Sequence, residues 1–312
     1  MNCFKRLLIL SSMPVYIPGR ILSCCLRIFL IAMLFVPIFA NSSQAMDYIV
    51  GVKGGYFAWD PYLKRVGPSQ FEQIETGSGT LYGPVLSVIF NQDFSFSFSG
   101  LFGKQSSYWT AKNYYADGET EPRTGTFTFE VKRIDLDSAL SYRVLEKLKI
   151  FIGYKYQRSD VTMDSVEYQV GGSNVYSRYE HLKLPMYASG PALGLGISMP
   201  IGDRYFFAGN ISAIYMRGKF DFENTITSYQ GDGTQNPLEI RKIKDIKTAT
   251  RGINAEPTIG ASTGEGMPVF TLGFRFQWSQ IKVLDSEKLT DCSNKWLNDF
   301  QYGVYVSIVQ PF

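Results

Sequence analysis

Large and small side chains alternate without a break over Phe94-Ser-Phe-Ser-Phe-Ser99, and this pattern constrains the fold more than any other feature of the chain. Alternate residues of a β-strand point to opposite faces, so the phenylalanines share one face and the serines the other. A soluble sheet that is wet on one side usually carries long polar or charged side chains there. Serine instead suits the crowded inner side of a tightly curved sheet, which leaves the aromatic face on the outside.

The same alternation recurs along the chain and gives ten candidate strands. We expect them near positions 48–56, 82–90, 94–103, 134–143, 150–157, 192–199, 205–215, 253–261, 270–278 and 300–312. Short connections alternate with long polar ones, which we expect over 60–78, 104–125, 158–183, 218–251 and 279–299. This arrangement predicts an all-β, closed, antiparallel transmembrane β-barrel of about ten strands of about 10 residues each, with short periplasmic turns and long extracellular loops. Closure is required because an unpaired strand edge cannot face lipid.

Residues 1–45 are expected to form a signal peptide that is cleaved from the mature chain. The cations of this segment are Lys5, Arg6, Arg20 and Arg27. A positive start, a short apolar run and small residues before the cleavage site are typical of secretory signals. We therefore expect cleavage after Ala45 and a barrel domain over 46–312, with translation starting at Met1 or Met13.

Removal of the leader changes the charge balance and excludes several classes of protein. The whole chain has a formal net charge of +3, but loss of the four leader cations reduces 31 Lys and Arg to 27, against 28 Asp and Glu. The basic surface that nucleic-acid binding requires is therefore missing. The mature chain has no apolar run near the roughly 20 residues of a membrane-spanning helix. Its many aromatic residues, 20 Tyr and 23 Phe in the full chain, argue against disorder.

With these features the chain resembles the outer-membrane β-barrel proteins of Gram-negative bacteria over essentially all of its mature length. The most specific motif is the C-terminal strand, in which Val304, Val306 and Ile308 alternate before a terminal Phe312. Gln310 departs from the apolar residue that is usual at its position. The resemblance implies a location in the bacterial outer membrane and contact with its lipid and lipopolysaccharide. It also implies recognition of the last strand by the barrel-assembly machinery.

Seven charged residues fall on the face that should line the barrel interior. They are Lys53, Asp135, Asp137, Arg143, Lys155, Glu256 and Arg275. Charges removed from water must be paired. Opposed residues of an antiparallel hairpin have a constant index sum, which places Glu256 opposite Arg275 and Asp137 opposite Lys155. Such pairs would brace a narrow interior, so we expect a plugged lumen or a narrow small-solute channel rather than a catalytic pair of carboxylates.

His181 is the one histidine of the chain, and Glu180 precedes it directly. Omptin proteases are outer-membrane barrels of similar size, but their Asp-x-His pair is missing here, as is the local His and Ser motif of the lipid A deacylases. One His and one Cys after the leader form no metal cluster. We therefore expect a non-enzymatic barrel without metal or cofactor. The alternatives are a barrel enzyme that uses His181, either an omptin-like protease or a lipid-modifying hydrolase, and an adhesin or receptor that acts through its surface loops.

Two further groups of residues have expected positions. The basic run 241–247 is expected in the fourth long loop, either solvated or in contact with lipopolysaccharide phosphates or another polyanion. Eight aromatic residues near strand ends are expected at the two membrane interfaces, where amphipathic rings are favoured. They are Trp59, Tyr62, Tyr108, Trp109, Tyr154, Tyr156, Trp278 and Tyr302.

Overall fold

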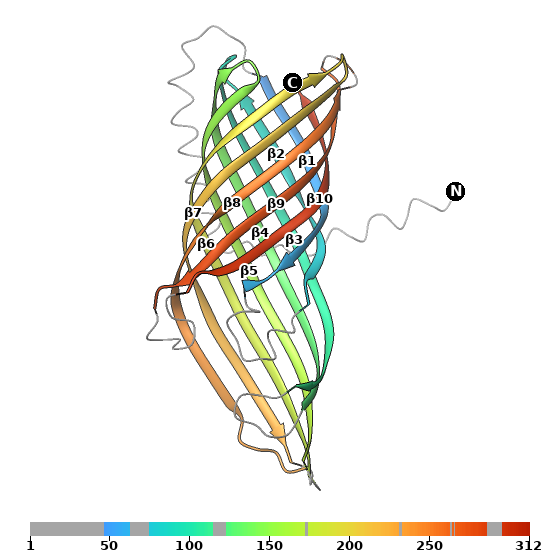
Figure 1. Ribbon diagram of the computed structural model, residues 1–312, viewed down its shortest axis with the longest axis vertical. Coiled ribbons are helices and arrows are strands. Elements are labelled where there is room, and N and C mark those ends of the chain that lie inside the picture. The colour runs from blue at the N-terminus through green and yellow to red at the C-terminus, as the bar shows by residue number, and fades with distance from the viewer. Residues whose placement is uncertain are drawn as a thin grey trace, which may run out of the picture. The chain divides into compact units, whose positions relative to one another are not determined.

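The chain forms one closed sheet of ten antiparallel strands in which each strand pairs with its neighbours in sequence (Figure 1). The computed structural model describes residues 47–62, 75–114, 123–171, 174–230, 233–262, 264, 266–285 and 295–312, so the expected signal peptide lies outside the described residues. The strands are β1 (Asp47–Asp60), β2 (Gly77–Ile89), β3 (Phe94–Tyr114), β4 (Arg123–Leu145), β5 (Leu148–Gly171), β6 (Asn174–Ile201), β7 (Tyr205–Tyr229), β8 (Glu239–Ser262), β9 (Val269–Val283) and β10 (Leu297–Pro311).

Pairing of the first strand with the last closes the ring. β1 and β10 pair from Ile49↔Pro311 to Asp60↔Phe300, so neither strand has a free edge along its length. The closed, ten-stranded antiparallel barrel expected from the sequence is confirmed. Among the described residues, no helix is long and apolar enough to cross a membrane.

The short turns lie at the same end of the barrel as the C-terminus (Figure 1). Between β2 and β3, the side chain of Asn91 accepts hydrogen bonds from the backbone N–H groups of Asp93 and Phe94. Between β6 and β7, Gly202 adopts a positive φ of 72°, which a residue without Cβ tolerates well. The expected β8–β9 turn lies only partly within the described residues.

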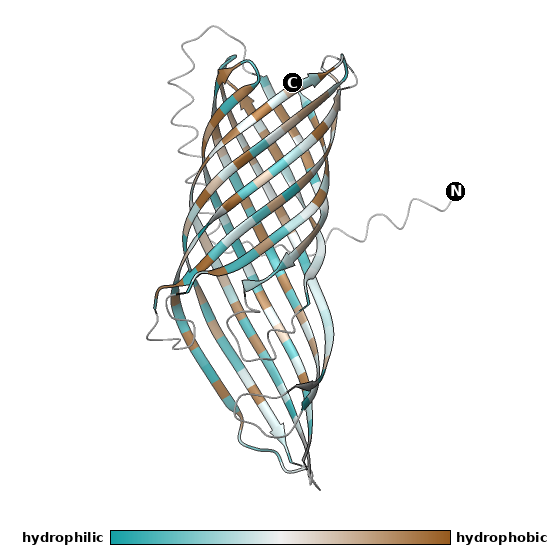
Figure 2. Ribbon diagram, viewed as in Figure 1, coloured by the Kyte–Doolittle hydropathy of each residue, from teal (hydrophilic) through white to brown (hydrophobic). Residues whose placement is uncertain are grey.

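Large apolar side chains face outward around the half of the barrel that lies next to these turns. Examples from eight strands are Val52, Tyr82, Ile152, Leu193, Ile211, Ile259, Leu272 and Val306, all more than half exposed. Hydrophobic and hydrophilic residues alternate along every strand (Figure 2). An apolar band on the outside of a closed sheet is solvated by lipid hydrocarbon, so this half of the barrel spans a membrane.

Six strands continue far beyond the other four, and here the expectation of strands of about ten residues was wrong. β3–β8 have 21 to 28 residues, whereas β1, β2, β9 and β10 have 13 to 15. The extension is defined here as the parts of β3–β8 beyond their last pairs with β2 (Ser78↔Ser106) and β9 (Thr248↔Val283). Most of the expected second, third and fourth long loops are therefore regular strand.

The polarity of the two faces reverses where the extension begins. On β5, Ile152 faces outward and Lys155 inward, but farther along Met163 is buried inside and Asp164 is exposed outside. The alternation of period two thus persists while its chemistry inverts, because water replaces lipid as the outer solvent. The polar residues that suggested loops are the wet outer face of this sheet.

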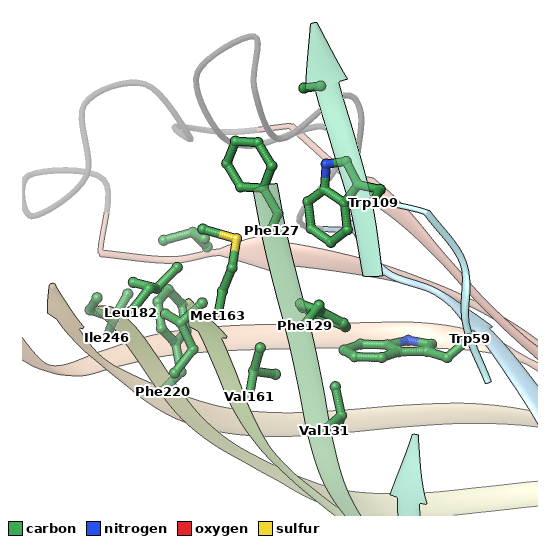
Figure 3. Packing of buried hydrophobic residues seen from close by; sticks show 13 residues of the cluster. Trp59, Trp109, Phe127, Phe129, Val131, Val161, Met163, Leu182, Phe220 and Ile246 are labelled. Atoms are coloured by element: carbon green, nitrogen blue, oxygen red, sulfur yellow. The ribbon is translucent and has the colours of Figure 1, made fainter. Parts of the chain in front are cut away.

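The inner face of the extension, with adjoining residues of β1, β4 and β9, forms a large apolar cluster (Figure 3). The apolar cluster contains Trp59, Trp109, Ala111, Phe127, Phe129, Val131, Val161, Met163, Leu182, Leu184, Phe220, Ile246 and Val283. Trp109 stacks on Phe127 with ring centroids 5.1 Å apart. The expected membrane-interface position is wrong for Trp59, Tyr62 and Trp109, since all three are buried inside.

Candidate functional site

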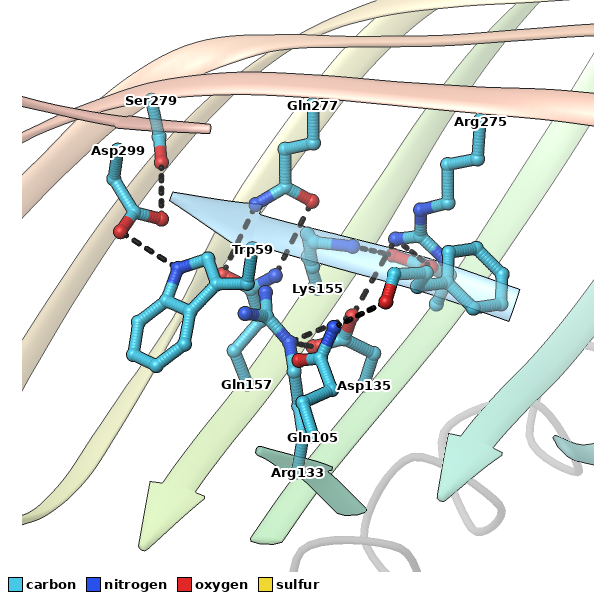
Figure 4. A network of polar contacts seen from close by, with 12 residues as sticks. Trp59, Gln105, Arg133, Asp135, Lys155, Gln157, Arg275, Gln277, Ser279 and Asp299 are labelled. Atoms are coloured by element: carbon cyan, nitrogen blue, oxygen red, sulfur yellow. Dashed lines mark hydrogen bonds and ion pairs between the residues drawn. The ribbon is translucent and has the colours of Figure 1, made fainter. Parts of the chain in front are cut away.

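Arg275 lies at the centre of an ion network inside the membrane-spanning half of the barrel (Figure 4). Its Nη2 atom is 3.2 Å from Asp137 Oδ2 and 3.9 Å from Asp135 Oδ2. Its Nε atom is 3.3 Å from Glu256 Oε1. β9 thus supplies one guanidinium that links carboxylates of β4 and β8 across the lumen. The expected pairing of Glu256 with Arg275 is confirmed.

Two lysines complete this network from other parts of the wall. Lys155 Nζ donates to Asp137 Oδ1 at 2.7 Å, and the two residues lie opposite each other on β5 and β4, as expected. Lys53 Nζ on β1 donates to Glu256 Oε2 at 2.8 Å and lies 3.8 Å from the ring centroid of Tyr305. Both lysine side chains are almost fully buried. Their charges therefore depend on the carboxylates for stabilisation.

One member of the network, Arg133, was not expected from the sequence, and one expected member, Arg143, stands apart from it. Arg133 Nε donates to Asp135 at 3.2 Å, and its side chain is buried. Arg133 shares the inward face with Asp135 two residues later, so extending the alternation by one pair would have found it. Arg143 is exposed near the β4–β5 turn and makes no ion pair with any described residue.

Amide side chains occupy the next inward positions after Lys155, Glu256 and Arg275, toward the apolar cluster. They form the amide layer, which consists of Gln105, Gln157, Asn254, Gln277 and Gln301. Arg133 of the ion network nevertheless contacts that cluster directly, since its Cζ atom lies 5.7 Å from the centroid of the Trp59 ring. Gln157 and Gln277 exchange two hydrogen bonds of 3.2 and 3.3 Å across the lumen (Figure 4). Gln301 is fully buried, yet neither atom of its amide has a partner among the described residues. The index sum that places Glu256 opposite Arg275 also places Asn254 opposite Gln277 on the inward face, and the strand register confirms it. Gln105 and Gln301 were not expected there.

Residues at the end of β1 cover the lumen on the side of the short strands. Asp299 Oδ1 accepts hydrogen bonds from Trp59 Nε1 at 2.8 Å and from the Tyr62 backbone N–H at 3.2 Å. The Tyr62 hydroxyl reaches Met186 Sδ on β6 at 3.6 Å. The chain that leaves β1 therefore bends inward over the lumen and is held there.

Glu180 and His181 do not form an acid–base pair, because adjacent residues of β6 face opposite sides of the sheet. Glu180 points inward, where its carboxylate is 3.2 Å from Arg178 Nη2 and accepts a hydrogen bond from Asn224 Nδ2 at 2.6 Å. Burial raises the pKa of the Glu180 carboxyl, while Arg178 and Asn224 partly offset the rise. The Arg178–Glu180 pair lies at the far side of the apolar cluster. A second buried ion pair, Arg123–Glu167, lies there too.

His181 lies on the outer face of the extension and has a different acidic partner. Its Nδ1 atom is 2.5 Å from Asp164 Oδ1 on β5. The register places Asp164, His181 and Thr225 in one row across β5, β6 and β7. The sequence analysis missed Asp164 because the pairing depends on the register of a segment that it read as a loop.

The basic run 241–247 is part of β8 rather than of a loop. Lys242 pairs with Glu223 across to β7 at 2.7 Å, and this contact lowers the pKa of the Glu223 carboxyl. Lys247 lies directly opposite Lys219 on β7. The run thus contributes to a mixed-charge outer face of the extension.

The C-terminal residues have the geometry expected of a last strand. Val304, Val306 and Ile308 all face outward within the apolar band. Phe312 is 73% exposed, and its backbone N–H donates to the carbonyl oxygen of Tyr48 at 2.8 Å. Within the part of the chain that the structure describes, no group of three or more His, Cys, Asp or Glu side chains is arranged to hold a metal ion.

Comparison with known proteins gives similarities in structure alone. No protein-family model and no curated protein matches the sequence. Among solved structures, the outer membrane protease OmpT from Escherichia coli is 9% identical and has a TM-score of 0.39. The matched region covers 86% of this chain and 96% of the OmpT chain. The toluene transporter TodX of Pseudomonas putida is 11% identical, with 88% and 92% covered and a TM-score of 0.37. The outer membrane protein OprG from Pseudomonas aeruginosa is 11% identical, with 86% and 97% covered and a TM-score of 0.24.

Proposed function

We propose that this protein is a non-enzymatic barrel of the bacterial outer membrane, with a sealed lumen, whose role is to hold a rigid extension above the membrane surface. The observation that carries the proposal is the sequence of layers inside the barrel. The ion network braces the membrane-spanning half, the amide layer follows, and the buried apolar cluster fills the extension. A solute would have to displace paired charges and then a dry core.

The apolar band and the ends of the strands support this location and orientation. Short turns on an exported barrel lie on the periplasmic side, and the longer elements project outward. The extension therefore projects from the cell surface. The outward-facing Val304, Val306 and Ile308, with the terminal Phe312, present the strand that we expect the assembly machinery to recognise.

Planar bilayer recordings and liposome swelling test the seal. The purified barrel is expected to show no stable open level and no swelling with small sugars. Glu256→Ala breaks the contacts of Glu256 with Lys53 and Arg275 and is expected to add current noise only, because the apolar cluster remains in place. Glu130→Ala, which removes a carboxylate paired with Lys104 on the outer face, is the matched control. Regular open steps in the unmodified barrel would overturn the proposal.

A second candidate function rests on the contact between His181 and Asp164. An imidazole oriented by a carboxylate through Nδ1 is the arrangement that general bases use. The row that it forms with Thr225 also places a hydroxyl on the next strand. Hydrolysis of peptide and lipid ester substrates by the reconstituted barrel, with His181→Ala and Asp164→Asn as variants, decides this case. Activity that is lost in both variants would favour the enzyme, whereas inactivity of the unmodified barrel excludes it for those substrates.

A further inference from the structure

The extension is an open sheet, so its first and last strands have free edges beyond the membrane-spanning half. β2 stops pairing with β3 at Ser78↔Ser106, and β9 stops pairing with β8 at Thr248↔Val283. Beyond these pairs, no strand among the described residues continues the ladder along either edge. The unpaired N–H and C=O groups of a strand edge are a template for another strand, and folded proteins usually protect them.

The edge of β8 is protected in the ways that folded proteins use. Four cations lie along it: Arg241, Lys242, Lys244 and Lys247. A bulge at Asp245, whose φ is 54°, interrupts the pairing of this segment with β7. The backbone of Lys247 is already bonded, because its N–H donates to Asp285 Oδ2 and its carbonyl oxygen accepts from the N–H of Leu284. Charges, bulges and covering groups of this kind oppose the addition of a strand.

The edge of β3 has none of this protection over Tyr108–Ala111, which we call the open edge. Its four residues carry no charge and include no proline, and Tyr, Trp and Thr favour strands. The register with β4 is regular as far as Ala111↔Gly125, so no bulge interrupts it. Ser107 Oγ donates to the carbonyl oxygen of Glu75 at 3.3 Å, so the chain that leads into β2 flanks β3 only as far as Ser107. One sheet therefore has one protected edge and one open edge.

Hydrogen bonds at the start of β3 show which backbone groups face the open edge. The carbonyl oxygen of Phe94 accepts from the N–H of Phe90 at 3.0 Å, on the side of β2. The carbonyl oxygen of the preceding residue, Asp93, accepts from Arg143 on β4 instead. Successive residues alternate in this way, and the register of β3 is constant over this length. The N–H and C=O groups of Tyr108 and Thr110 therefore point along the open edge, where no described strand meets them.

We propose that the open edge of β3 binds an extended polypeptide segment of a partner protein, which adds to the extension as a further strand. The ladder of backbone groups identifies the class of partner, because an extended polypeptide repeats donors and acceptors at the spacing of a strand. Backbone bonds supply the affinity in this mode of recognition, and the side chains on the two faces supply the specificity. The inference requires water around the extension and does not depend on a sealed lumen.

Side chains beside the open edge state what the added strand should carry. On the outer face, Lys112 and Lys132 are exposed and form no ion pair with any described residue, which favours acidic residues at the outward positions. On the inner face, Trp109 is 4% exposed, and its Nε1 atom has no hydrogen-bond partner among the described residues. This nitrogen points away from Phe129 (Figure 3). Threonine at the inward positions would supply a hydroxyl acceptor for it.

Fluorescence anisotropy with the full mature barrel in lipid nanodiscs tests the proposal. The probe is a labelled peptide of alternating threonine and glutamate. Thr110→Pro removes an N–H that faces the open edge and no ladder bond to β4, so the barrel should fold and bind the peptide at least roughly tenfold more weakly. Thr110→Val keeps the backbone and is the matched control, with unchanged affinity. A peptide of alternating threonine and lysine should bind severalfold more weakly than the glutamate peptide.

Each other outcome contradicts the proposal. Absence of binding by the unmodified barrel, undiminished binding by Thr110→Pro, or equally strong binding of the fully N-methylated peptide would overturn it. Self-association of the barrel that Thr110→Pro abolishes would also overturn it, by making a second copy of the chain the occupant. Heat-modifiable gel mobility verifies folding, and Tyr108→Pro, which removes the other free N–H, should give the same loss. A conducting barrel with peptide binding that depends on Thr110 would refute the sealed lumen and leave the open edge standing as a binding site.

Discussion

Replacement of Arg275 by alanine is expected to lower the free energy of unfolding of the barrel by about 3 kcal/mol. Arg275 is 1% exposed and contacts three carboxylates at 3.2, 3.3 and 3.9 Å. Loss of one partner from a buried ion pair typically costs about 3–5 kcal/mol. Each carboxylate keeps one other cation, at 2.7 Å for Asp137, 2.8 Å for Glu256 and 3.2 Å for Asp135. The cost should therefore fall at the lower end of that range.

Urea unfolding of the barrel refolded into lipid vesicles, followed by tryptophan fluorescence, measures this change. Arg275→Lys keeps the charge but loses the planar guanidinium that contacts three carboxylates at once, so it should recover only part of the loss. Arg251→Ala provides the control, because Arg251 lies on the outer face with Gln280 as its hydrogen-bond partner. If Arg275→Ala costs no more than Arg251→Ala, the ion network does not brace the lumen and the reasoning fails.

Three further variants address the other layers. Gln277→Met should destabilise the barrel by about 1–3 kcal/mol more than Gln301→Met, because it strands Gln157 whereas Gln301 has no partner to lose; urea midpoints in the reverse order would contradict this. Phe129→Ala should cost about 3–5 kcal/mol and raise amide hydrogen exchange in the extension before the membrane-spanning half; uniform exchange would show that the two halves unfold together. The raised pKa of Glu180 means that its carboxyl favours the folded state when protonated, a contribution lost as the pH rises through the folded-state pKa. The native barrel should therefore gain stability relative to Glu180→Gln as the pH falls through the raised folded-state pKa toward the ordinary carboxyl value, and a relative loss on acidification would show that Arg178 sets the pKa instead.

The sequence was sufficient for the membrane-spanning half because two simple rules apply there. Alternation of period two assigns residues to faces, and the constant index sum of a hairpin assigns partners, so that the sequence alone places Asp137 opposite Lys155, as the register confirms. Both rules depend only on backbone geometry. They fail where the position of a turn is wrong, or where the outer face meets water instead of lipid.

The extension escaped prediction because its alternation has the opposite chemistry. Val161 and Met163 on β5 are buried inside, while their neighbours on the outer face are polar. A search for apolar residues on the outside reads such a segment as a polar loop. The contact between His181 and Asp164 was lost for the same reason, since it joins two strands whose existence was not expected. Alternation of period two, whichever face carries the apolar residues, identifies both the extension and the contact between His181 and Asp164.

The reversal of polarity along β3–β8 fixes how deeply the barrel sits in the membrane. A shift of one pleat, about 6.6 Å along a strand, would draw outward cations such as Lys132 and Arg158 toward hydrocarbon, where each costs up to roughly 2–4 kcal/mol near the midplane. A shift the other way would expose the apolar band to water. The sequence of these strands therefore sets the level of the membrane surface on the barrel, and the number of residues beyond the apolar band sets the height of the far end of the extension above it. Lengthening β3–β8 by two residues each would raise the far end of the extension by one pleat without moving the membrane-spanning half.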